Sequence, residues 1–183
     1  MSETDQAGIA DIVTFWRDAG PDAWFTKDAA FDETFRQRFL DRHFAAARRE
    51  YDHWVETAEG TLALMILLDQ FPRNSFRGTG HMYATDSLAH FYADQALEKG
   101  HDLTLEPSLR GFLYLPFMHS EDIDQQLRCV KLYTASVPSQ IKWAEEHYDI
   151  IRRFGRFPHR NVILGRKSTP EELEFLEAGG FSG

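Results

Sequence analysis

Apolar residues recur every three or four positions along most of the chain, which is the spacing of one face of an α-helix. In the first such stretch Ile9, Ile12 and Trp16 share a face. A later stretch, 62–68, is apolar almost all the way round, so we expect a central helix there. The predicted helices run from about Asp5 to Ala19, from Asp32 through a charged outer face to Glu50, from Gly60 to Leu68, from His81 to Lys99, from Pro107 to Pro116, from Glu121 to Thr134, from Pro138 to Phe154 and from Pro170 to Leu176.

Polar residues at the edges of these stretches indicate where helices begin. Asp32 and Ser120 are candidate N-caps, because a short polar side chain at that position accepts hydrogen bonds from the first backbone amides. Thr169, followed by Pro170 and Glu172, predicts a capping box at the start of the last helix.

No stretch alternates apolar and polar residues in the way that a half-buried strand requires, so we predict an all-α fold. Short connections favour about seven to nine helices arranged in antiparallel hairpins. A length of 183 residues is typical of one domain, which we expect to span residues 1–183.

Composition narrows the class of protein. The formal net charge of −9 disfavours general binding to nucleic acid or to an anionic membrane, since phosphate contacts need a positive surface. Cys129 is the only cysteine, which rules out an intrachain disulfide and suits a reducing cytoplasm. The apolar run 112–118 is far shorter than the roughly 20 residues that span a bilayer. We expect a soluble, cytoplasmic protein.

The segment from Arg153 to Arg166 has the most unusual pattern, with four arginines and one histidine among two glycines and a proline. Gly155 suits a helix C-terminus, and Pro158 disfavours helix in the residue before it, which predicts a helix end followed by an ordered loop. The segment 68–78 shares the order Phe-Pro-Arg-Asn and a later Arg and Gly with this segment, but the 153–166 copy inserts His159 and reverses the last pair to Gly165-Arg166. Two such turns indicate two arms of one site.

Guanidinium groups crowded into loops repel each other unless carboxylates or an anionic ligand satisfy them. The candidate ligand-binding residues are Arg73, Asn74, Arg77, Arg156, His159, Arg160, Asn161 and Arg166. His119 and His147 are candidates for proton transfer, with Glu121 or Asp69 to orient the imidazole. Three of these candidate residues also have a purely structural explanation. Asp69 could form an ion pair, His147 could be a hydrogen-bonded core residue, and Glu121 could belong to a helix cap.

Three functions fit these residues. The first is a binding protein for an anionic small molecule or an acidic peptide, the second a metal-independent hydrolase or lyase, and the third a scaffold for protein partners whose two turns lock helix pairs. A metal is the weaker option, because a His-Glu-x-x-His motif is absent from the sequence, although Glu146 with His147 and His119 with Glu121 could contribute ligands. Gly-rich phosphate loops are absent too, so we expect no metal and no cofactor. Formation of a homo-oligomer stays open, because in a chain this rich in aromatic residues the sequence does not distinguish exposed apolar helix faces from buried ones.

Three long motifs resemble a known family. They are 67–74 (Leu-Leu-Asp-Gln-Phe-Pro-Arg-Asn), 115–122 (Leu-Pro-Phe-Met-His-Ser-Glu-Asp) and 153–161 with 164–166. In this order they closely resemble the bacterial family catalogued as domain of unknown function 924, and the resemblance extends from Ile12 to Leu176. It implies an all-helical, tetratricopeptide-like fold and carries no agreed activity, substrate or catalytic residue. Arg17 stands where the family pattern leads us to expect an aromatic residue.

Overall fold

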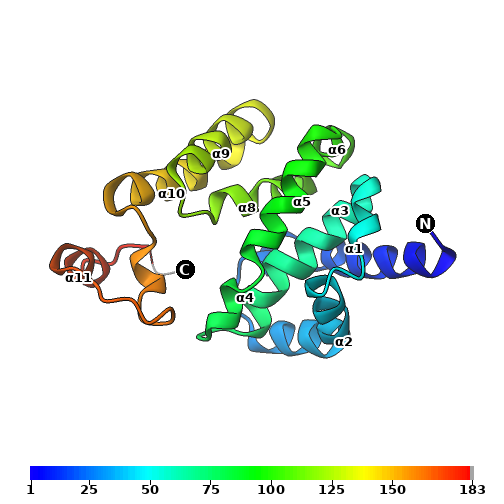
Figure 1. Cartoon of the computed structure of the whole chain (residues 1–183), viewed down its shortest axis with the longest axis horizontal. Helices are drawn as coiled ribbons and strands as arrows, with labels where there is room; N and C mark the ends of the chain where they lie inside the picture. Colours follow the sequence, from blue (N-terminus) through cyan, green and yellow to red (C-terminus); the bar gives the residue numbers. More distant parts are fainter. Residues whose placement is uncertain (182–183) are drawn as a thin grey trace. The chain divides into compact units, whose positions relative to one another are not determined.

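The computed structural model describes residues 1–181, and helices form most of that range (Figure 1). Residues 1–181 contain no strand, which confirms the predicted all-α fold. The chain divides into two compact units, residues 1–77 with 81–116, and residues 78–80 with the chain from Phe117 onward. A single domain and a tetratricopeptide-like arrangement stay predictions. No helix among the described residues has the length and apolar character needed to span a membrane.

The first unit is built around one apolar helix. All residues from Leu62 to Leu68 are fully buried, and α1, α2 and α5 pack around this segment, as expected for a central helix. Its elements are α1 (Glu3–Trp24), α2 (Ala29–Ala47), η1 (Asp52–Glu56), α3 (Ala58–Met65), η2 (Ile66–Gln70), α4 (Phe71–Ser75), η3 (Gly80–Tyr83), α5 (Asp86–Glu98), α6 (His101–Thr104), α7 (Pro107–Arg110) and η4 (Gly111–Leu113), with α8 (Leu115–Met118) at the boundary.

Several predicted boundaries in this unit are wrong, and the helix predicted from Pro107 to Pro116 is divided into α7, η4 and α8. The N-cap of α2 is Asp28, whose carboxylate accepts from the amides of Ala30 and Phe31, and Asp32 lies inside the helix. Asp32 and Asp28 are both suitable N-cap residues, and the chain turns into the helix at the earlier one. The helix predicted from His81 begins at Asp86 instead, after a short 3₁₀ turn.

The segment η2 is a π-helix, and Pro72 explains its hydrogen bonding. Proline has no N–H to give to a carbonyl one turn back, and the amide of Phe71 bonds to Ile66 rather than to Leu67. The carbonyls of Leu67 and Leu68 are thereby released from the usual helical hydrogen bonds, and side chains contact them instead. The His43 Nδ1 lies 2.8 Å from the Leu67 oxygen, and the Thr85 hydroxyl donates to the Leu68 oxygen at 2.5 Å. The helix therefore continues through a proline that we predicted would lie in a turn.

The second unit contains a helix pair, α9 and α10, that packs together (Figure 1), followed by a loop and a short final helix. Asp122, not Ser120, is the N-cap of α9, and its carboxylate accepts from the amides of Asp124 and Gln125. The predicted capping box at Thr169 is confirmed. The elements are α9 (Ile123–Ser136), η5 (Pro138–Gln140), α10 (Ile141–Phe154), η6 (Pro158–Arg160) and α11 (Pro170–Glu177).

Helix α10 ends as the sequence predicts. Gly155 adopts φ 68°, a left-handed conformation that suits glycine at a helix C-terminus. Beyond it the chain turns back on α10, and Phe157 is fully buried with Ile150 and Ile151. The partly buried rings of Phe154, Phe175 and Phe181 pack on this cluster. The loop after α10 is thus fixed by its own aromatic core.

Candidate functional site

The two Phe-Pro-Arg motifs have different backbones. Phe71 is α-helical, with φ −52° and ψ −47°, and leads into α4. Phe157 is extended, with φ −87° and ψ 109°, and leads into the 3₁₀ turn η6. The prediction of a helix end and an ordered loop is confirmed for the second motif only. The two motifs are therefore similar in sequence but not in backbone conformation, and the side chains of each bind different residues.

Carboxylates of the first unit bind the arginines of the first motif. The Arg73 guanidinium contacts both oxygens of Asp86, at 2.9 and 3.0 Å, and one oxygen of Asp69 at 3.1 Å. Asp69 is 1% exposed. A buried carboxylate of this kind needs a charged partner, and Arg73 supplies it, in line with the structural interpretation of Asp69. Asp32 accepts from Arg77 at 2.6 Å and from Asn74 at 2.7 Å.

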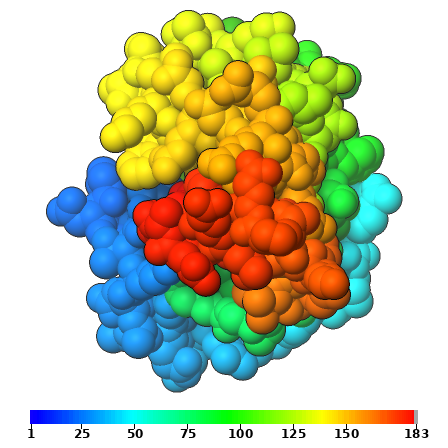
Figure 2. Space-filling model, turned by 90° about the vertical axis from the view of Figure 1, so that its left-hand side faces the viewer, coloured from blue at the N-terminus to red at the C-terminus, as the bar shows by residue number. Residues whose placement is uncertain are grey.

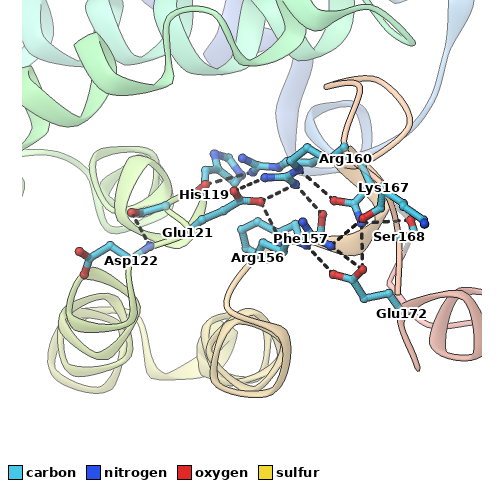
Figure 3. Close-up of polar contacts among 12 residues, drawn as sticks. His119, Glu121, Asp122, Arg156, Phe157, Arg160, Lys167, Ser168 and Glu172 are labelled. Atoms are coloured by element: carbon cyan, nitrogen blue, oxygen red, sulfur yellow. Dashed lines mark hydrogen bonds and ion pairs between the residues drawn. The ribbon is translucent and has the colours of Figure 1, made fainter. Parts of the chain in front are cut away.

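In the second unit, Glu121 and Arg166 join the start of α9 to the loop after α10 (Figure 3 shows Glu121 among its partners). The two nitrogens Nη1 and Nη2 of Arg166 bind the carboxylate at 2.6 and 2.9 Å, and the Phe157 amide donates to it at 2.8 Å. Burial alone would raise the pKa of Glu121, but the hydrogen bonds from Arg166 and Phe157 hold it below its ordinary value. Both carboxylate oxygens of Glu121 thus accept hydrogen bonds from residues of the loop after α10.

A second carboxylate, Glu172, joins α11 to the same loop (Figure 3). Arg156 binds it through Nε at 2.6 Å and Nη2 at 2.7 Å, and Asn161 donates to it at 3.2 Å. Hydrogen bonds, first from Arg156 and then from the Thr169 amide, lower the pKa of Glu172 to about 2. Asn161 also accepts from Arg166 at 2.9 Å, so the two ion pairs are connected.

Two histidine rings, those of His147 and His159, lie against Phe157, and the His119 ring lies against His147. His147, only 6% exposed, has its ring centroid 5.5 Å from that of Phe157 and 6.4 Å from that of His119. Its Nδ1 lies 2.8 Å from the Trp143 carbonyl oxygen, so a neutral His147 donates from Nδ1.

His159 lies on another side of Phe157, with ring centroids 5.6 Å apart. Burial, reinforced by the charge of Arg160, lowers the pKa of His159 to about 3, so the ring is neutral near pH 7. The Nδ1 atom of His159 is buried and has no hydrogen-bond partner among the described residues. Arg160 stacks on Phe157 at 4.6 Å and donates to the His119 carbonyl at 3.0 Å. We call His119, His147, His159 and Arg160 the histidine cluster.

Sequence reasoning missed several residues around this cluster. Glu172 was assigned only to a capping box, and Phe181 was assigned no role. The spacing of Glu121 and Arg166, 45 positions apart, gives no local signal that they pair. A shallow depression of ≈ 370 Å³ lies nearby, lined by Arg153, Phe154, Arg156, Thr169, Glu171 and Glu172.

Residues 1–181 give little support to metal binding or to catalysis by a cysteine nucleophile. Within that range no group of three or more His, Cys, Asp or Glu side chains is arranged to hold a metal ion. Cys129 is fully buried, and burial raises the pKa of its thiol to about 12, so it is protonated near pH 7. A thiol in that state is a poor nucleophile.

Comparison with known proteins agrees with the resemblance carried by the three motifs. A family described as "Bacterial protein of unknown function (DUF924)" matches residues 12–180. The chain is also similar to a solved structure of a protein of unknown function from Agrobacterium tumefaciens, at 61% sequence identity and a TM-score of 0.93, over 95% of this chain and 99% of that one. No curated protein matches the chain.

Proposed function

This chain belongs to the DUF924 family of bacterial proteins of unknown function, and we propose that it is a binding protein whose histidine cluster holds a carboxylate. The ligand is an anionic small molecule or an acidic peptide. The observation that carries this proposal is the buried Nδ1 of His159, which has no hydrogen-bond partner among the described residues. A buried polar atom without a partner destabilises the protein by about 1 to 3 kcal/mol, so such an atom calls for a functional explanation.

The chemistry of the cluster suits a carboxylate. A neutral His159 donates one hydrogen bond without carrying charge, and the adjacent Arg160 provides the positive charge. Hydrogen bonds from charged donors to carboxylates are about twice as strong as neutral ones. The His147 ring lies against Phe157 and the His119 ring lies against His147, so both add further imidazole groups to the cluster. The fixed ring of Phe157 keeps these groups in place before a ligand arrives.

The arginines bound to carboxylates have a different role in this proposal. Arg156 and Arg166 bind Glu172 and Glu121 and hold the loop, and Asn161 connects the two pairs. In the first unit, Arg73 is bound to Asp86 and Arg77 to Asp32 in the same way, with Asn74 also on Asp32. These residues position the helix ends, and the ligand contacts are left to the histidine cluster.

A purely structural scaffold is the second candidate. It is favoured by the bidentate contacts of Arg73, Arg156 and Arg166, because each guanidinium already has a carboxylate partner within its own unit. A metal-independent hydrolase or lyase is supported less well. Such an enzyme needs a carboxylate to orient its histidine, and the two oxygens of Glu121 bind Arg166 and the Phe157 amide.

Binding can be tested by thermal unfolding and calorimetry with glutamate, citrate and the dipeptide Asp-Asp. A ligand at a hundredfold excess over its dissociation constant stabilises the folded state by about 2.7 kcal/mol, which raises the midpoint. We expect at least one probe to do so, and His159→Phe to abolish the effect while the protein stays folded. His53→Gln is the matched control, since His53 is half-exposed and lies in the first unit. Binding that survives in His159→Phe contradicts the proposal, and no binding by any probe favours the scaffold.

A further inference from the structure

The segment after α11 turns back onto the second unit through two glycines. Gly179 has φ 82°, which favours glycine. At Gly180 a Cβ atom would lie 2.5 Å from the Phe175 carbonyl oxygen and 2.6 Å from the Phe175 ring, so a larger residue does not fit. The Gly180 amide donates to that oxygen at 2.9 Å. These contacts direct the next residue, Phe181, toward the loop after α10.

The Phe181 ring lies directly on two members of the histidine cluster. Its centroid is 4.6 Å from that of His147 and 5.2 Å from that of His159, and both pairs meet at steep angles. The ring is partly buried against Ile150, Ile151 and Phe157. Figure 2 shows α11 and the segment that follows it, in red, on the outer surface of this unit. Phe181 thus covers one side of the His147 and His159 rings.

We propose that Phe181 occupies an aromatic subsite of the histidine cluster, and that the ligand is an acidic peptide whose aromatic side chain takes its place. This inference rests on the proposed function, in which the same cluster binds a carboxylate. Edge-to-face contacts with His147 and His159 are open to any aromatic side chain of similar size. The choice of a peptide follows from the present occupant, because Gly180 and Phe181 are themselves a peptide segment seated on this surface.

The occupant is attached to α11 through residues that can change conformation. Its attachment to α11 passes through Gly179 and Gly180, which are the residues with the greatest conformational freedom. Among residues 1–181, the Gly180 amide bonds to the Phe175 carbonyl and the Phe181 ring packs on the aromatic core of the second unit. A site that is open for only a fraction of the time binds its ligand more weakly by that same fraction. Phe181 therefore lowers the apparent affinity for an aromatic ligand and leaves the affinity for a non-aromatic one nearly unchanged.

Two dipeptides that differ only by the ring test this inference. Calorimetry with Asp-Phe and Asp-Ala is carried out on the native protein, Phe181→Ala and Leu173→Ala. Leu173 is a matched control, because its side chain is exposed on α11, six positions before Gly179. We expect Phe181→Ala to bind Asp-Phe about tenfold more tightly than the native protein. Asp-Ala should bind equally to all three, and Leu173→Ala should behave as the native protein does.

The other outcomes separate this inference from the proposed function. Equal affinities for the two dipeptides in every variant overturn the aromatic subsite but leave the carboxylate site standing. Weaker binding of Asp-Phe to Phe181→Ala means that the ring is a fixed wall, which overturns displacement. Absence of binding by both dipeptides, in every variant, overturns this inference, and the tests with glutamate and citrate then decide the proposed function. Phe181→Leu keeps most of the apolar volume and should strengthen Asp-Phe binding as well, so the test does not depend on the alanine variant folding.

Discussion

Two glycines next to Trp54 differ in the space around them. A Cβ atom on Gly8 would lie 3.5 Å from the Trp54 ring, an ordinary contact, whereas one on Gly60 would lie 2.1 Å from the Trp54 carbonyl oxygen. We expect Gly60→Ala to lower the free energy of unfolding by about 1 to 3 kcal/mol or more, because backbone must move. Gly8→Ala should raise it by about 0.5 to 1 kcal/mol, since alanine favours a helix interior. Urea unfolding measures both, and equal effects would contradict the prediction.

Glu172 links the stability of the second unit to pH. The folded pKa of about 2 lies below the ordinary value of 4.5, so this carboxylate stabilises the fold above pH 4.5. That contribution, on the order of 3 kcal/mol, should be lost as the pH falls from 4.5 toward 2. We expect Glu172→Gln to lower stability at pH 7 and to flatten the acid limb of a stability–pH curve. Glu174→Gln, an exposed change on the same helix, is the control, and an unchanged acid limb in Glu172→Gln would refute the assignment.

At the scale of elements, Pro72 and Thr85 should be coupled through the carbonyl of Leu68. The Thr85 hydroxyl satisfies this buried carbonyl because Pro72 has no N–H. Thr85→Val should therefore destabilise the native protein by about 1 to 3 kcal/mol. In a Pro72→Ala background the new amide can serve the carbonyl instead, and the cost of Thr85→Val should fall.

A double-mutant cycle by urea unfolding measures this coupling. We expect an interaction energy of at least about 0.5 kcal/mol between the two positions. Strictly additive effects would show that the proline is not the reason for the hydroxyl contact. Thr34→Val is a suitable control, because Thr34 also donates to a carbonyl, that of Ala30, at an exposed position away from η2.

Features set by neighbouring residues could be predicted from the sequence. The apolar stripe of α10, the left-handed Gly155 and the capping box at Thr169 each depend on a window of a few residues, and all three are confirmed. The N-caps at Asp28 and Asp122 were missed, because several short polar residues stand within four positions and only the path of the chain selects one. Local pattern fixes the type of an element better than its first residue.

The partners of the candidate site residues could not be predicted in this way. Glu121 meets Arg166, and Asp32 meets Arg77, across 45 positions each, and only the packing of the helices brings them together. The sequence identified the arginines correctly as groups that need anionic partners, but it could not show that carboxylates of the same chain supply them. The aromatic contacts of Phe181 have the same origin, since they depend on a turn through two glycines.

At the scale of the whole molecule, the charge of −9 sets what the surface attracts. Binding to DNA requires the release of counterions by clustered Lys and Arg, and affinity then falls steeply with salt. Here Arg73, Arg77, Arg156 and Arg166 are bound to carboxylates, which lowers the positive potential that they offer to phosphates. We therefore expect no binding to a 20-base-pair duplex in fluorescence anisotropy at 50 or 150 mM salt. Binding at 50 mM that weakens steeply by 150 mM would show a basic surface, and would redirect the search for a ligand from carboxylates to phosphates.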